Sequence, residues 1–225
     1  LYTGTRKSKG DETGLKLIAD LHTHTSASQH VYSTLYENVV QASRRGLSVL
    51  ASTDHGPALP DSPHVWRIAK QGKYPRVIEG VRVLKGVEAN VEDFGGTLDV
   101  PEEILRGLDW VVASLHHYVI PPAGEKDHTR CWQAVAQNPL VDLIGHCCDP
   151  HFPFDPEPAV RAFREGRKVV ELNNNTVKRY PESRPLWLRV LRLCEEHRVP
   201  VAVDSDAHFC TLVGQAPEAL ALLEE

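Results

Sequence analysis

Short apolar segments rich in β-branched residues recur along the chain, and most of them end in a polar residue. Seven segments of this kind lie at residues 15–24, 47–55, 81–90, 108–117, 141–148, 168–175 and 199–208. Most are continuous apolar runs without strict alternation, which is typical of strands that are covered on both faces. The pattern therefore predicts seven buried strands.

Segments with helical periodicity lie between several of these strands. Residues 33–46 carry a capping box formed by Thr34 and Glu37, followed by apolar residues at helical spacing and a stop at Gly46. Further helices are expected at residues 128–138, 156–166, 184–197 and 216–225. The alternation of strands and helices predicts an α/β fold of parallel βα units, closed as a barrel or open as a doubly wound sheet.

The length of the chain indicates one large domain. With 225 residues, it has a size at which α/β barrels commonly remain undivided. The start of the chain is polar and rich in Gly, Thr and Lys, so we expect an N-terminal extension at residues 1–15 and a single domain at residues 16–225. No repeat, low-complexity tract or linker divides the sequence.

The composition argues against several classes of partner. The net charge is −5, so the chain lacks the basic footprint of a nucleic-acid-binding protein, and we expect no such partner. No apolar run reaches the length of a membrane span and no signal-peptide pattern opens the chain, so we expect a cytoplasmic protein without a membrane partner. The five cysteines lack CxxC spacing, which argues against a disulfide framework. The oligomeric state is not predicted.

Side chains able to bind a metal ion follow six of the seven predicted strands. Catalytic groups of βα barrels gather at the C-terminal mouth, where several strands contribute at once. A single HxH pair is a weak signal, but seven of the 12 histidines fall at or just beyond strand ends, which indicates a convergent site. These seven include His30 from the first loop, and with two carboxylates the candidate ligands are His22, His24, His30, His55, Glu88, His116, His146, Asp206 and His208. The sixth strand, which ends in Glu171 and three asparagines, offers no obvious ligand.

The ligand types narrow the choice of metal. Imidazole and carboxylate without thiolate suit zinc, manganese or iron, and the residues alone do not choose among them. Nine ligands exceed what one tetrahedral zinc ion with an open position takes. With one bridging carboxylate, they would serve two or three ions. The sequence therefore predicts a multinuclear centre.

Six motifs together resemble the PHP (polymerase and histidinol phosphatase) family, most closely its free-standing bacterial phosphatases. They are "DLHTHT", "STDHG", "GVEAN", "ASLHH", "IGHCCDP" and "DSDAH", and the resemblance runs from about Lys16 to near the C-terminus. It implies a distorted seven-stranded (β/α)7 TIM-like barrel with a trinuclear metal site, generally of zinc.

The resemblance also implies how the ligands are shared. The first ion would be held by His22, His24 and Asp206, the second by His116 and His146, and the third by His30, His55 and His208, with Glu88 bridging the first two ions. Glu88, Asp206 and His208 are the candidate catalytic residues. Two departures from the family pattern lie beside ligands: His117 follows His116, and Cys147 and Cys148 follow His146.

The function that these features predict is the hydrolysis of small phosphate monoesters, with a metal-bound hydroxide as nucleophile. The alternatives are a phosphodiesterase or exonuclease that acts on nucleotide or nucleic-acid ends, and a histidinol phosphatase. A non-enzymatic metal-binding module is disfavoured because no ligand position is broken. A carbon–nitrogen amidohydrolase also begins with HxH, but it needs fewer ligands and often a lysine, which is absent from these strand ends.

Other polar residues receive weaker predictions. Asp20 and Asp54 flank ligands, so each either orients a ligating imidazole or makes an ordinary strand-end hydrogen bond. His64, His128, His151 and His197 are expected in loops or helices without a metal, and His117 is expected beside a ligand in a supporting role. The cysteines at positions 131, 147, 148 and 194 are expected to be buried structural thiols.

Overall fold

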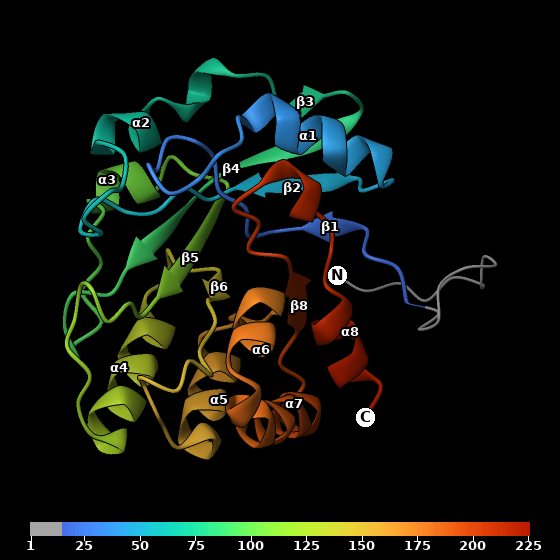
Figure 1. The fold of residues 1–225 in the computed structure, drawn as a ribbon. Helices are drawn as coiled ribbons and strands as arrows, with labels where there is room; N and C mark the ends of the chain where they lie inside the picture. Colours follow the sequence, from blue (N-terminus) through green and yellow to red (C-terminus); the bar gives the residue numbers. More distant parts are fainter. Residues whose placement is uncertain (1–14) are drawn as a thin grey trace.

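The predicted strands form one curved sheet in which seven strands run parallel. The computed structural model describes residues 15–225, and its strand order is β1-β2-β4-β5-β6-β7-β8 (Figure 1). The bounds of these strands are Ala19–Asp20 (β1), Val49–Ser52 (β2), Val81–Asn90 (β4), Trp110–Ser114 (β5), Leu143–Ile144 (β6), Val169–Asn173 (β7) and Val201–Asp204 (β8). A short strand, β3 (Val77–Ile78), pairs antiparallel with the start of β4.

The first and last strands meet, so the sheet closes almost completely into a barrel. The backbone N–H of His24 donates to the carbonyl oxygen of Ala207 at 3.0 Å. Three residues earlier, the backbone N–H of Leu21 donates to the carboxylate of Asp204 at 2.6 Å. The expected seven-stranded TIM-like barrel is confirmed.

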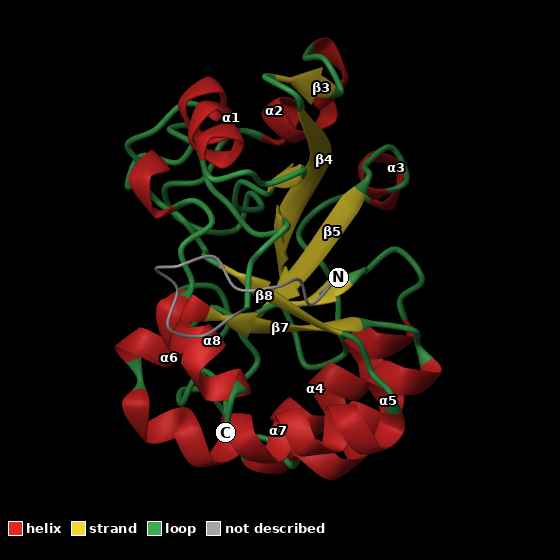
Figure 2. Ribbon diagram, turned by 90° about the vertical axis from the view of Figure 1, so that its right-hand side faces the viewer, coloured by secondary structure: helices red, strands yellow, loops and turns green. Residues whose placement is uncertain are grey.

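Helices cover the outside of the barrel, and the five predicted ones are present. The bounds are Leu35–Arg44 (α1), Val65–Ala69 (α2), Glu102–Leu105 (α3), Glu125–Gln137 (α4), Pro156–Glu165 (α5), Asn174–Arg179 (α6), Arg184–His197 (α7) and Pro217–Leu223 (α8). The capping box of Thr34 and Glu37 forms as predicted at the start of α1. Helices α4, α5 and α7 lie side by side along the later strands, whereas α1 and α2 lie at the other end of the molecule (Figure 2).

A small apolar cluster fills the inside of the barrel. It consists of Leu21, Ala51, Val112, Leu143 and Ala202, which come from five different strands or their immediate continuations. Layers of side chains from different strands are the usual filling of βα barrels. This apolar cluster packs beneath the C-terminal ends of the strands, where the charged side chains lie.

The larger apolar core lies between the strands and the outer helices. It contains the buried side chains of Trp132, Phe163 and Trp187. The cysteines at positions 131, 147, 148 and 194 are all buried, as predicted. Burial raises the pKa of the Cys131 and Cys194 thiols to about 12, so both remain protonated at neutral pH.

Two expectations remain predictions. Residues 1–14 lie outside the described residues, so the division into an extension at 1–15 and a domain at 16–225 is not tested. The cytoplasmic location is not tested either. Within residues 15–225, no helix combines the length and apolar character that a bilayer span requires.

Candidate metal centre

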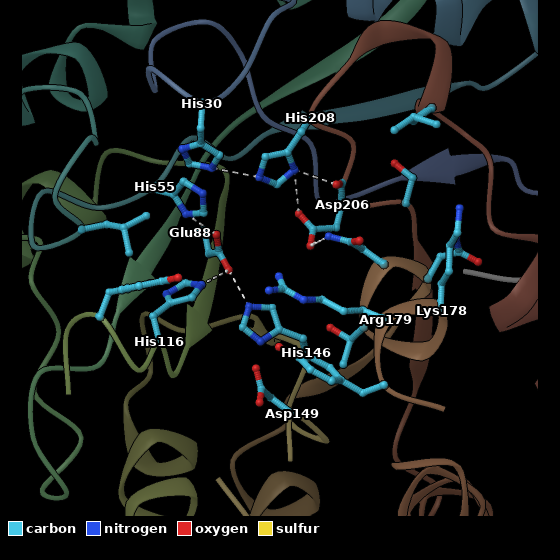
Figure 3. A pocket seen from close by; sticks show the side chains of 18 of the residues that line it. His30, His55, Glu88, His116, His146, Asp149, Lys178, Arg179, Asp206 and His208 are labelled. Atoms are coloured by element: carbon cyan, nitrogen blue, oxygen red, sulfur yellow. Dashed lines mark hydrogen bonds and ion pairs between the residues drawn. The ribbon is translucent and has the colours of Figure 1, made fainter. Parts of the chain in front are cut away.

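Glu88, near the end of β4, lies at the centre of the nine candidate ligands (Figure 3). Its Oε2 atom is 2.6 Å from Nδ1 of His55 and 3.4 Å from Nε2 of His22. Its Oε1 atom is 2.9 Å from Nε2 of His146 and 3.4 Å from Nε2 of His116. The two oxygens therefore face different imidazoles, which is the arrangement expected of a bridging carboxylate.

Asp206, just beyond the end of β8, connects the remaining candidates. Its Oδ1 atom is 3.0 Å from Nε2 of His24, 3.8 Å from Nε2 of His22 and 3.5 Å from Nδ1 of His208. Nε2 of His208 is in turn 3.1 Å from Nε2 of His30. All nine candidates thus meet in one network, although they come from positions between 22 and 208 of the chain.

The burial of the candidates changes from one side of the network to the other. His22 and His24 are fully buried, whereas 28% of the His208 side chain and 42% of the His30 side chain are exposed. A cavity of about 670 Å³ opens above this network, and the other seven candidates all line it. The centre therefore has a closed floor and an open rim that a substrate can reach.

The facing imidazoles of His30 and His208 indicate a place for a cation. His30 Nδ1 lies 2.5 Å from a carboxylate oxygen of Asp61, and His208 Nδ1 lies 2.9 Å from the carbonyl oxygen of Asp206. Both Nδ1 atoms must carry a proton to make these contacts, so each neutral ring directs the lone pair of its Nε2 toward the other ring. Two lone pairs 3.1 Å apart repel each other unless a proton or a cation lies between them.

Buried atoms without hydrogen-bond partners support the same interpretation. Nε2 of His22, Nε2 of His24 and Oε2 of Glu88 are buried and form no well-aligned hydrogen bond, although Oε2 of Glu88 and Nε2 of His24 lie within 3.0 Å of a polar atom. Buried polar atoms are normally paired, so unpaired ones need an explanation. Within residues 15–225, three overlapping groups of side chains could each hold an ion, because their ligand atoms lie within 4.8 Å of one another. The groups are His22 with His24 and Glu88, His24 with His55 and His208, and His55 with Glu88 and His116. The donor set fits metal binding.

Glu171, for which the sequence suggested no role, holds two candidates in place. One carboxylate oxygen lies 2.7 Å from Nδ1 of His22, and the other accepts the backbone N–H of His146 at 2.6 Å. Asn90 plays a similar part, because its Oδ1 atom lies 2.7 Å from Nδ1 of His116. In both cases the contact fixes the tautomer and leaves Nε2 free to bind an ion. Glu171 and Asn90 were missed by the sequence analysis, as was Asp61.

Electrostatics favour cations at the centre. Burial raises the pKa of the Glu88 and Asp206 carboxyls, but nearby imidazoles outweigh it and hold both values well below the usual range. Burial lowers the pKa of His22, but the carboxylates of Glu171, Glu88 and Asp206 outweigh it and hold that value well above normal. The carboxylates are thus ionised at neutral pH, and metal ions and protons compete for the same imidazole.

Two candidates adopt a left-handed backbone. The φ angle is +25° at His146 and +53° at Asp206. Residues other than glycine rarely adopt such values, and strain of this kind is concentrated at functional sites. The turn at His146 is fixed by the bond from its N–H to Glu171, which directs the imidazole toward Glu88.

Comparison with known proteins agrees with this geometry. The PHP domain family matches residues 20–153. A protein of Acetivibrio thermocellus named probable phosphatase is 42% identical over 211 residues, which covers 94% of this chain and 88% of the relative. The chain belongs to the PHP domain family. Another relative named probable phosphatase, from Caldanaerobacter subterraneus, is 42% identical over 213 residues, covering 94% of this chain and 84% of the relative.

A solved structure shows the same fold. Histidinol phosphate phosphatase from Lactococcus lactis, determined with zinc, L-histidinol and phosphate, superimposes with a TM-score of 0.67. The sequence identity is 14%, and the match covers 92% of this chain and 90% of the other protein. At this identity the likeness shows the fold alone.

Asp20 and Asp54 of this PHP domain lie outside the network of nine candidate ligands. Asp20 does not orient an imidazole; it accepts hydrogen bonds from Ser205 and from the backbone N–H of Gly214. Asp54 likewise accepts from the backbone and hydroxyl of Thr25. Both make the ordinary hydrogen bonds that were the alternative prediction.

The other histidines of the PHP domain were predicted to have no metal, and three of them have structural partners. His64 caps α2, His128 bonds to the backbone of Ala123 and Pro153, and His197 lies 3.6 Å from Glu157. None of these contacts involves a candidate ligand.

Proposed function

We propose that this PHP protein is a metal-dependent phosphatase that hydrolyses small-molecule phosphate monoesters. The observation that carries the proposal is Glu88, whose two oxygens face separate groups of imidazoles beneath an open cavity. Membership of the PHP family, and relatives of similar length that are named probable phosphatases, support the same reaction class. The substrate partner would be a phosphate ester rather than a nucleic acid.

The proposed centre holds three divalent ions, with zinc preferred and manganese or iron as alternatives. His22, His24 and Asp206 would hold the first ion, His116 and His146 the second, and His30, His55 and His208 the third, with Glu88 shared between the first two. When bound, such cations polarise phosphoryl oxygens and lower the pKa of water, so that hydrolysis proceeds near neutral pH.

The chain's own residues bind and orient the ester. Glu88 and Asp206 supply the negative charge that keeps several cations together, and His208 lies at the open rim of the cavity. Arg179, at the end of α6, extends toward Glu88 and His146 (Figure 3). Its guanidinium is suited to bind the phosphoryl oxygens, because its planar donors match the geometry of a phosphate.

Metal analysis and a simple assay test the proposal. Freshly purified protein should contain close to three ions per chain and should release phosphate from an aryl phosphate such as 4-nitrophenyl phosphate. The double substitution His22→Ala with His24→Ala should abolish both. Hydrolysis that survives this double substitution, or a metal content of zero or one ion in the active protein, would refute the assignment.

The test should include a diester. Bis(4-nitrophenyl) phosphate distinguishes a phosphatase from a phosphodiesterase, since a monoesterase should cleave it far more slowly than the monoester. Faster cleavage of the diester would favour the alternative reaction.

A further inference from the structure

Four rings form a second cluster beside the metal centre, and none of them belongs to the nine candidates. We call this cluster, made of His117, Tyr118, His151 and Tyr180, the aromatic wall. The rings of His117 and His151 are stacked, with centroids 4.6 Å apart and planes at 23°. The ring of Tyr118 lies 4.0 Å from that of His117, and the ring of Tyr180 lies 5.9 Å from that of His151 at 78°.

The wall is held rigidly by polar contacts. Oδ1 of Asp149 accepts the backbone N–H of His151 at 2.9 Å and lies 2.7 Å from Nδ1 of the same residue. This pair of contacts fixes the plane of the His151 ring, and thereby the ring of His117 stacked on it. At the other end of the wall, the guanidinium of Arg179 lies 5.3 Å from the centroid of the Tyr180 ring.

The wall faces the same cavity as the metal centre. His117, Tyr118 and Tyr180 line this cavity together with Glu88 and Arg179. His117 and Tyr118 directly follow His116 in the chain, so they lie next to the place where a phosphoryl group would bind. Figure 3 shows Asp149 below His146, on the side of the pocket away from His30 and His208.

The size of the cavity leaves room for more than a phosphoryl group. Its volume of about 670 Å³ is that of a site for a drug-sized molecule. Tyr118 is 69% exposed, so packing within the protein does not account for its position at the mouth. A flat, rigid and partly exposed aromatic surface is suited to stacking against another flat ring.

We propose that the aromatic wall binds a planar ring in the leaving group, so that the preferred substrates are phosphate monoesters that carry an aromatic or heteroaromatic ring. This inference rests on the proposed phosphatase function and specifies its substrate class. The metal centre and Arg179 bind the phosphoryl group, and the wall binds the ring of the alcohol that is released.

The test compares two esters with leaving groups of similar reactivity. Benzyl phosphate and cyclohexylmethyl phosphate both release a primary alcohol with a six-membered ring, but only the first ring is planar. For the metal-loaded enzyme, kcat/KM should be about fivefold higher for benzyl phosphate, as a single stacking contact provides. Because any general damage to the metal centre lowers both rates, the ratio reports on the wall alone.

Variants connect this ratio to the wall. His117→Ala and Tyr118→Ala should each reduce the ratio toward one, whereas His117→Phe, which keeps a flat ring, should preserve it. Tyr36→Ala is the matched control, because Tyr36 is an exposed tyrosine on α1 whose hydroxyl bonds to Glu79 and which does not line the cavity. This control should leave the ratio unchanged.

The outcomes separate the two proposals. A ratio near one in the unmodified enzyme, or a ratio that His117→Ala and Tyr118→Ala leave unchanged, overturns the aromatic wall as a binding site while the phosphatase function stands. If neither ester is hydrolysed and 4-nitrophenyl phosphate is not hydrolysed either, the phosphatase function fails. Calorimetry then decides on the wall independently, because benzylphosphonate should bind about fivefold more tightly than cyclohexylmethylphosphonate, and equal affinities refute the wall.

Discussion

The carboxylate of Glu171 lies 2.7 Å from Nδ1 of His22, and both side chains are fully buried. The contact joins β7 to the segment after β1, and it is the reason that Nε2 of His22 faces Glu88. The second oxygen of Glu171 accepts the backbone N–H of His146. One carboxylate therefore positions ligands proposed for two different ions.

Glu171→Gln should weaken metal binding. The amide of glutamine offers only one acceptor oxygen, so either Nδ1 of His22 or the N–H of His146 loses its partner. Supporting contacts of this kind commonly contribute about 10–100-fold to metal affinity, and we expect a loss of that size. Competition with a chelator measures it. Glu165→Gln, an exposed residue at the end of α5, is the control, and equal metal affinity in both variants would contradict the role of Glu171.

Arg179→Ala should raise KM for phosphate monoesters more than it lowers kcat. Hydrogen bonds to charged groups contribute about 1.5–3 kcal/mol, so we expect an increase in KM of roughly 10- to 100-fold. Arg179→Lys should recover only part of this, because an ammonium lacks the planar pair of donors. Steady-state kinetics provide the measurement, with Arg106→Ala as a control, since Arg106 pairs with Glu102 on the surface. An unchanged KM for Arg179→Ala would exclude a phosphoryl contact.

Removal of metal should destabilise the protein. Without a cation, the lone pairs on Nε2 of His30 and His208, 3.1 Å apart, oppose each other, and imidazoles alone are left to compensate the charges on Glu88 and Asp206. A ligand present at 100 times its Kd stabilises the folded state by about 2.7 kcal/mol per site. Thermal unfolding of chelated protein should therefore begin at a lower temperature, and zinc should restore it. Identical melting curves with and without zinc would contradict a metal centre.

Gly145→Ala should destabilise the barrel next to His146. A Cβ atom at position 145 would overlap Oγ of Ser114 and lie 2.8 Å from Cγ1 of Val112, both on the neighbouring strand β5. Overpacking of this kind is destabilising by about 1–3 kcal/mol, which denaturant unfolding can measure. Gly72→Ala is the matched control, because a Cβ atom there meets nothing within 4 Å. Equal losses of unfolding free energy in both variants would show that close packing does not require glycine at position 145.

Much of the barrel could be predicted because the hydrophobic pattern reports burial directly. The continuous apolar runs mark the strands, and ligand-type residues at their ends mark the mouth. Strand boundaries were less predictable: β1 and β6 contain two residues each, so His22 and His146 lie just beyond the strands that precede them. The positive φ angle at His146 was not predictable either, because histidine has no strong preference for this conformation.

Supporting residues were harder to predict for a different reason. Glu171 contacts His22 across 149 positions of sequence, and a glutamate at a strand end looks the same whether it binds metal, holds a ligand or faces solvent. Asn90 and Asp61 present the same difficulty. Arg179 reaches the pocket because of the path of the chain after β7, which depends on tertiary packing rather than on local sequence.

The span of the nine ligands along the chain has a consequence for biosynthesis. His22 follows β1 and His208 follows β8, and the two edges of the sheet meet through segments beside these positions. A nascent chain that has emerged as far as β7 still lacks Asp206 and His208. Activity would therefore be absent from unfinished products of the ribosome and would appear only when the final strand docks.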